Sequence, residues 1–228
     1  MMFSYVHTNM SKLSRPCLRC LFSLLMITGL QGCISTVPSA TSAIYDFGAF
    51  RGSAAVHLSS DSCALGPLHV ADITSPSSLE SDLMLYRLGY ANDQLVHAYA
   101  RHRWSMPPAQ LLAQRIKTRL ADSGVIIVDS GGTESSASLP STAMTNTLQL
   151  RLELNDFTHY FSDPDHSQSQ LTVRASLLNG SSLIAQTTLS QHAPSLSQDA
   201  AGGAKAMQEA TDLLINELHG WLCAQARH

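Results

Sequence analysis

The sequence has little charge and few aromatic side chains. Charged residues make up 14% of its 228 residues and aromatic residues 6%, while hydrophobic residues make up 44%. The formal net charge of −3 leaves no basic field, which argues against a nucleic-acid partner and against adhesion to acidic lipid by charge alone. The hydrophobic fraction is that of a packed globular domain rather than of a disordered chain.

Signatures of enzymes and metal sites are also missing from the sequence. It contains no G-x-x-x-x-G-K-S/T loop for a nucleotide and no G-x-S-x-G turn for a nucleophilic serine. Its ten histidines are scattered without the spacing of zinc ligands, and its aspartates fall at predicted turns and strand ends. We therefore expect no catalytic residue, no metal and no cofactor.

The amino-terminal segment has the features of a bacterial secretory leader. Three basic residues precede an apolar run at residues 21–30, LFSLLMITGL, which is too short to span a bilayer. The run ends in Leu30, Gln31, Gly32 and Cys33, which resemble the lipobox of bacterial lipoproteins. Gln31 departs from the small residue that is commoner there. In such a motif only the cysteine thiol can form the thioether to diacylglycerol.

The lipobox predicts cleavage before Cys33, with residues 1–32 as the signal peptide and acyl chains such as palmitate on Cys33. Each buried methylene contributes about 0.8 kcal/mol, so two or three chains anchor a protein durably. Ile34 is not the aspartate that favours inner-membrane retention in enterobacteria, so we expect the periplasmic face of the outer membrane rather than the inner. The alternative is an ordinary secretory leader, or an uncleaved anchor, with an incidental cysteine.

The cysteines that remain after processing predict one disulfide bond. Cys17 and Cys20 lie in the leader and Cys33 takes the lipid, so the mature chain keeps Cys63 and Cys223. Two thiols in an oxidising periplasm commonly pair, and we expect a Cys63–Cys223 bond. Two buried free thiols are the alternative.

Residues 33–43 read as the lipidated cysteine and a small, polar tether, followed by one domain at 44–228. Hydrophobic alternation and turn residues predict strands, with hairpins across Ala91-Asn92-Asp93 and Asn179-Gly180. The expected strands are 65–73, 83–90, 94–101, 125–128 (buried on both faces), 146–157, 170–178 and 182–190.

Two amphipathic helices are expected beside these strands. One begins at Met106-Pro107-Pro108 with Ser105 as its N-cap, and the other covers 204–224. The fold class is therefore α+β, a mixed, mainly antiparallel sheet with two amphipathic helices packed on one face. Arg115, Lys117 and Arg119 are expected to form a solvated face of the first helix.

Arg101, Arg103 and Trp104 are the candidate partner contacts, because arginine and tryptophan are favoured interface anchors. The alternative is that Trp104 fills the core where the first hairpin meets the helix, while the two arginines are solvated.

The order of these features resembles the ABC-type transport auxiliary lipoprotein family. The resemblance rests on the lipobox, the Tyr45-Asp46-Phe47-Gly48 start, the strand ending in His102-Arg103-Trp104, and the helix that begins at Pro107-Pro108. It implies a non-enzymatic accessory of a lipid transport system that supports membrane integrity. The implied partners are a periplasmic MCE-domain protein and its ABC permease and ATPase, besides the membrane itself through the acyl chains; a homo-oligomer is left open.

A second function of another class is an outer-membrane lipoprotein that activates a periplasmic peptidoglycan synthase. A long tether would favour the synthase, because that partner works at the peptidoglycan layer. The tether here has about ten residues and reaches at most about 35 Å, which favours a partner close to the membrane.

Overall fold

Seven strands form one mixed sheet in the part of the chain that the computed structural model describes, residues 42–48, 65–128 and 147–226. These residues all lie in one unit, Thr41–His228. The predicted signal peptide, the lipobox, most of the tether and Cys63 lie outside them. In chain order the elements are β1 (Ala43–Tyr45), β2 (Leu68–Val70), a 3-10 helix (Ser77–Leu79), β3 (Leu83–Leu88), α2 (Gly89–Asn92), β4 (Asp93–Trp104), α3 (Pro108–Asp122), β5 (Leu148–Asp163), β6 (His166–Asn179), β7 (Ser182–Pro194) and α5 (Ala200–Gln225).

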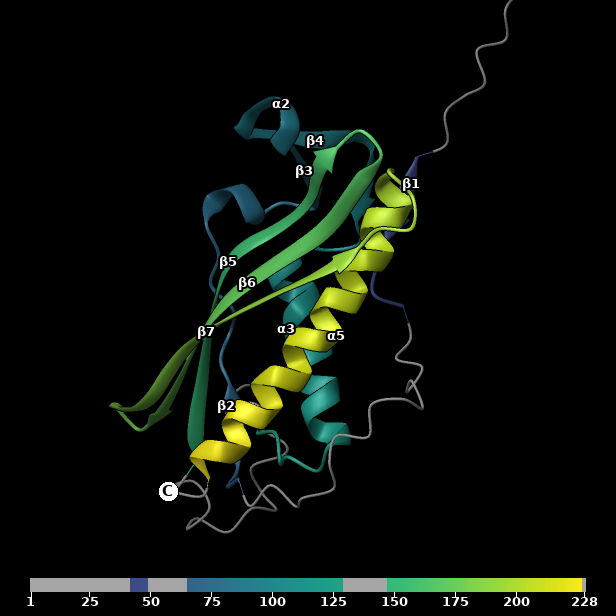
Figure 1. Cartoon of the computed structure of the whole chain (residues 1–228). Helices are drawn as coiled ribbons and strands as arrows, with labels where there is room; N and C mark the ends of the chain where they lie inside the picture. Colours follow the sequence, from purple (N-terminus) through teal and green to yellow (C-terminus); the bar gives the residue numbers. More distant parts are fainter. Residues whose placement is uncertain (1–41, 49–64, 129–146, 227–228) are drawn as a thin grey trace, which may run out of the picture. The chain divides into compact units, whose positions relative to one another are not determined.

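The strands follow the order β1-β4-β3-β5-β6-β7, and β2 pairs with β5 beside this path (Figure 1). The pairs β3–β4, β5–β6 and β6–β7 are antiparallel, and the shorter pairs β1–β4, β2–β5 and β3–β5 are parallel. This confirms the expected α+β class with a mixed, mainly antiparallel sheet.

The alternating strand predicted at 146–157 is the first part of β5. Leu150, Leu152 and Leu154 are buried as expected, because residues two apart point to the same face of a strand. A register shift between Leu154 and Asp156 then changes which alternate residues face the core, from even-numbered to odd-numbered positions. Phe157 and His159 therefore point inward. The strand therefore continues to Asp163, six residues beyond the predicted end.

Both predicted hairpins are present, with different turns. Asn179 pairs with Ser182 at the end of β6–β7, and Gly180 adopts φ +57° in the turn, where a side chain would be strained. The β3–β4 hairpin is closed by the single helical turn α2 rather than by three residues.

The two long helices begin differently from the prediction. Pro107 is the N-cap of α3 and Pro108 its first residue, whereas the backbone N–H of Ser105 bonds to the carbonyl of Tyr45, so the predicted Ser105 cap is wrong. Helix α5 begins four residues early, because the Asp199 carboxylate accepts a hydrogen bond from the Gly202 N–H at 2.8 Å.

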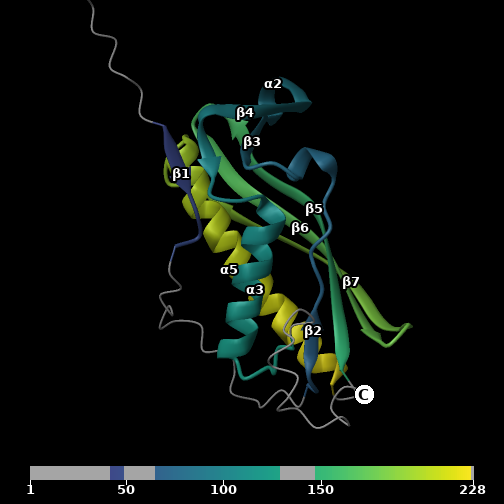
Figure 2. The same cartoon turned by 180° about the vertical axis from the view of Figure 1, so that it is seen from behind.

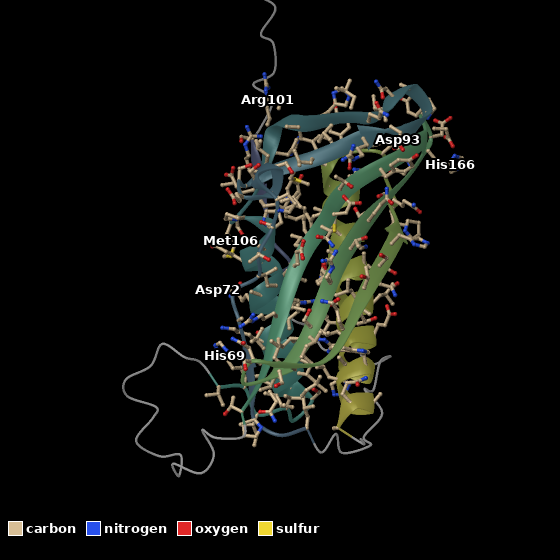
Figure 3. The ribbon with its side chains drawn as sticks, turned by 90° about the vertical axis from the view of Figure 1, so that its left-hand side faces the viewer. His69, Asp72, Asp93, Arg101, Met106 and His166 are labelled. Atoms are coloured by element: carbon tan, nitrogen blue, oxygen red, sulfur yellow. The ribbon has the colours of Figure 1, made fainter. Side chains whose placement is uncertain are left out.

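Helices α3 and α5 lie side by side and run in the same direction (Figure 2). Both cover one face of the sheet, and the other face is open toward the viewer in Figure 3. The core between the layers joins leucines of β5 and β6 to the inward side chains of both helices.

The strand predicted at 125–128 does not form. Ile127 makes only an isolated bridge to Leu68, through hydrogen bonds that the Ile126 carbonyl and the Val128 N–H exchange with Leu68. Val125 is buried but Ile126 is 57% exposed, so this segment is not buried on both faces.

Candidate functional site

The described chain begins beside the end of β4. Ala43 pairs with His102 in a parallel register, and the Ser42 hydroxyl donates to the carbonyl of Arg101 at 3.1 Å. At the other end of β1, the Ser105 N–H donates to the Tyr45 carbonyl at 2.7 Å. Any tether that precedes residue 42 therefore meets the folded body at this end of β4.

The three predicted contact residues are consecutive in β4 but have different surroundings. Arg101 is exposed, whereas Arg103 is half-buried and donates from Nη1 to the carbonyls of Tyr99 and His102. Trp104 is 4% exposed and packs edge-on against Phe157, with ring centroids 5.3 Å apart. Trp104 is therefore a core residue, the alternative considered for it, and only the two arginines can offer a contact surface.

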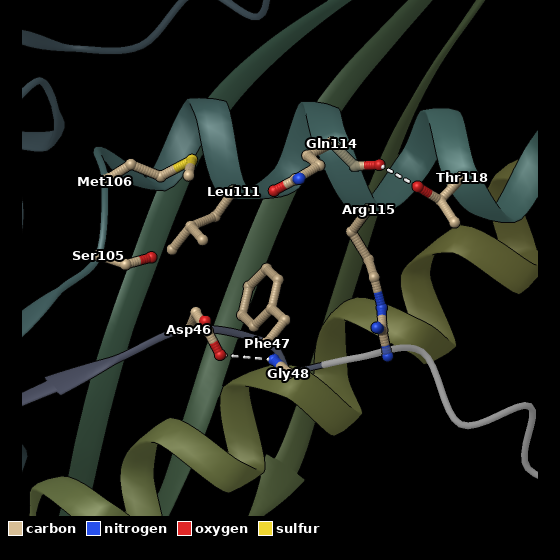
Figure 4. Close-up of a pocket in the computed structure, with 9 residues that line it drawn as sticks. All are labelled: Asp46, Phe47, Gly48, Ser105, Met106, Leu111, Gln114, Arg115 and Thr118. Atoms are coloured by element: carbon tan, nitrogen blue, oxygen red, sulfur yellow. Dashed lines mark hydrogen bonds between the residues drawn. The ribbon is translucent and has the colours of Figure 1, made fainter.

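A hollow of about 540 Å³ opens between the end of β1 and α3 (Figure 4). Phe47, Met106 and Leu111 give it an apolar wall, and Gln114 and Thr118 add polar groups from α3. Its carboxylate, Asp46, accepts the Gly48 N–H at 2.7 Å and so closes a local turn. Ser105 and Arg115 complete the lining.

Two buried arginines join α3 to α5, which contradicts the expected solvated face. Arg115 is 6% exposed, and its Nε and Nη2 donate to the two carboxylate oxygens of Asp212 at 3.0 and 2.8 Å. Arg119 is 7% exposed and donates to Asn216 Oδ1 at 2.9 Å. The charge is tolerated because each guanidinium meets a polar partner on the facing helix.

A histidine network lies under the end of the sheet that carries β3 and β4. The ring of His159 is 3% exposed; its Nδ1 lies 2.8 Å from Tyr99 Oη. Its Nε2 lies 2.9 Å from the hydroxyls of Ser167 and Ser195. Burial lowers the pKa of His159 to about 4, against a weaker opposing effect of the Asp199 carboxylate. Burial also raises the pKa of Tyr99, so both groups are neutral at pH 7.

This network holds elements together rather than forming an accessible site. Gly203 of α5 lies so close that a Cβ there would collide with the His159 ring. The predicted strand ended at Phe157, so the sequence analysis did not assign His159 to the core. The sequence does contain a signal for this position. Phe157, His159 and Phe161 are two residues apart, and this alternation indicates that the histidine points inward with the two phenylalanines.

The sulfur of Cys223 on α5 lies 3.6 Å from His219 Nε2. Its predicted partner Cys63 is outside the described residues, so the Cys63–Cys223 pairing stays a prediction.

No group of three or more His, Cys, Asp or Glu side chains in the described part of the chain could hold a metal ion. No helix within the same residues has the length and hydropathy needed to cross a membrane.

One family model matches most of the chain, and two solved structures share its fold. The model of the family described as "ABC-type transport auxiliary lipoprotein component" matches residues 53–218. The crystal structure of protein XCC0632 from Xanthomonas campestris superposes with a TM-score of 0.59 at 18% identity, over 72% of this chain and 86% of that one. A second crystal structure, of a protein described as uncharacterized, gives 0.57 at 12% identity, over 79% and 98%. At these identities the two structures show a shared fold. No curated protein matches the sequence.

Proposed function

Because the chain belongs to the family of ABC-type transport auxiliary lipoprotein components, we propose that it is the accessory of an MCE-type ABC system that moves lipid between the inner and outer membranes. The family match over residues 53–218 carries this proposal, since it covers most of the folded body. The role would support membrane integrity, with a periplasmic MCE-domain protein and its ABC permease and ATPase as partners.

The proposed anchor is the acylated Cys33 that follows the leader, on the periplasmic face of the outer membrane. Cys33 precedes the first described residue, Ser42, by nine residues, which span at most about 30 Å. The body is therefore held near a bilayer, where a membrane-spanning transport system has its components. A short tether also disfavours the peptidoglycan synthase as a partner.

The surface proposed for the partner is the Arg101 and Arg103 end of β4. Arg101 is exposed beside the tether, and Arg103 is fixed by two carbonyls, so its orientation is set before a partner binds.

Crosslinking in intact cells tests this function. The lipoprotein, tagged at its C-terminus, is crosslinked, solubilised from the envelope and purified, and its partners are identified by mass spectrometry. The proposal expects an MCE-domain protein, with a lower yield for Arg101→Ala. Arg174→Ala on the open sheet face is the matched control, because this exposed arginine lies on β6, away from the end of β4. Recovery of a peptidoglycan synthase without transport proteins would overturn the proposal.

A further inference from the structure

Large apolar side chains are exposed on the β3–β4 hairpin and beside it. Tyr90 in α2 is 50% exposed, and Leu95 and Val96 in β4 are 49% and 40% exposed. Neighbouring residues of a strand point to opposite faces. Both faces of β4 at Leu95 and Val96 are therefore only partly covered by the body, and this end of the hairpin protrudes from the core.

The protruding part of β4 carries no charge. Between Asp93 and Arg101 the sequence is QLVHAYA, seven uncharged residues. The neighbouring strand β3 adds one cation, because Arg87 pairs with Val96 and donates from Nη1 to the Asp93 carbonyl at 3.0 Å. An apolar surface with an arginine at its border is suited to the interface of a bilayer, where the long side chain of arginine can extend to the headgroups.

The tether joins the body at the same end of the unit, but at the opposite terminus of β4 from Leu95 and Val96. Ile44 of β1, two residues after Ser42, is 73% exposed, and the Ser42 hydroxyl bonds to the Arg101 carbonyl. Strand β4 crosses this end of the unit between α2 and β1 (Figure 1), and Figure 3 shows Arg101 and Asp93 at this end and His69 near the other. A chain of nine residues from Cys33 keeps Ser42 within about 30 Å of the anchor, and Leu95 lies six strand residues, about 20 Å, from Arg101.

We propose that the bilayer itself covers the protruding hairpin end formed by Tyr90, Leu95 and Val96, so that the body rests on the membrane in one orientation. This inference rests on the lipid anchor of the proposed function. The tyrosine suits the bilayer interface, because its ring is apolar and its hydroxyl stays hydrated. The acyl chains supply the anchoring, and this small surface sets the orientation.

The opposite end of the sheet offers a matched control. Leu183 and Ile184, near the β6–β7 turn, are neighbours in sequence and are 57% and 47% exposed. Asn179, which pairs with Ser182 at this turn, also pairs with Leu148 at the start of β5, whereas Leu88 beside α2 pairs with Phe161 near its end. The two apolar hairpin ends are thus exposed to a similar degree, the control slightly more, and lie at opposite ends of β5.

Photo-crosslinking to lipid tests the inference in the full-length protein. The photoreactive residue p-benzoylphenylalanine replaces Leu95 or Val96, and in control variants Leu183 or Ile184. Cells are irradiated, and mass spectrometry of the purified protein measures phospholipid adducts and the acylation of Cys33 in the same sample. The inference expects several-fold more phospholipid adduct at residues 95 and 96 than at 183 and 184.

Three results would overturn it. Equal amounts of lipid adduct at both ends of an acylated protein would contradict the proposed orientation but not the proposed acyl anchor. Protein adducts alone at residues 95 and 96 would assign this surface to a protein partner. A Cys33 without acyl chains would remove the proposed anchor, and the inference with it.

Discussion

Arg115 and Asp212 form a two-bonded ion pair, 3.0 Å from Nε and 2.8 Å from Nη2, that joins α3 to α5. One helical turn further along both helices, Arg119 bonds to Asn216. Because both pairs advance by four residues on each helix, the two helices must run in the same direction. The helix layer that covers the sheet is thus joined by polar contacts as well as by its apolar core.

Removing the Arg115 guanidinium is expected to destabilise the protein. Arg115→Met leaves the Asp212 carboxylate without its partner, and because that side chain is 30% exposed we expect a loss of about 1–3 kcal/mol in the free energy of unfolding. Urea unfolding measures it. Arg174→Met, which breaks an exposed pair with Glu153 at 3.4 Å, is the control and should cost less than about 1 kcal/mol. An equal loss of stability in the two variants would contradict a larger contribution from the buried pair.

Gly203→Ala is expected to destabilise the protein although alanine is the better helix former. The added Cβ collides with His159, and the shift that this forces costs about 1–3 kcal/mol. Gly220→Ala in the same helix meets nothing within 4 Å and should stabilise by about 0.5–1 kcal/mol. Thermal unfolding of both variants checks this, and stabilisation by both would contradict the close packing of α5 on His159.

Mild acid is expected to destabilise the fold through His159. Its pKa is about 4 in the folded protein and near 6.5 when unfolded, so below pH 6.5 the unfolded chain binds a proton that the folded one resists. The contribution of neutral His159 to the free energy of unfolding is complete above pH 6.5 and is lost as the pH falls toward 4. Burial lowers the pKa of His219 as well, which acts in the same direction.

Urea midpoints between pH 7 and pH 5 measure this effect. His159→Asn should be less stable at pH 7 and show a shallower decrease with falling pH than the native protein. The control His166→Asn, at an exposed side chain, should keep the native slope. A native slope in His159→Asn would exclude His159 as the source.

The predicted Cys63–Cys223 bond would join the start of the domain to α5. The chain-entropy estimate for so long a loop is about 5 kcal/mol, as an upper figure. We expect a non-reducing peptide map to contain one crosslinked peptide with both residues, and Cys223→Ser to unfold at lower urea. Alkylation of both cysteines without reduction would contradict the pairing.

Elements with a strong local pattern were predictable from the sequence. The alternating leucines of β5, the turn at Gly180 and the apolar stripe of α5 each depend on neighbours in the chain. The bulge after Leu154 was not predictable in this way, because it reverses which residues point inward. The burial of His159 was therefore not predicted.

The helix pair shows a second limit. Arg115 and Arg119 were expected in solvent because a charged residue is rarely buried without a partner. Their partners Asp212 and Asn216 lie 97 residues further along the chain, so no local pattern reveals them. The matching spacing of four residues on both helices is the signal that could have indicated the pairs.

The mass of the mature protein purified from the cell envelope tests the central claim most directly. We expect the chain to begin at Cys33 and to carry two or three acyl chains there. A soluble polypeptide with a free thiol at residue 33 would contradict it.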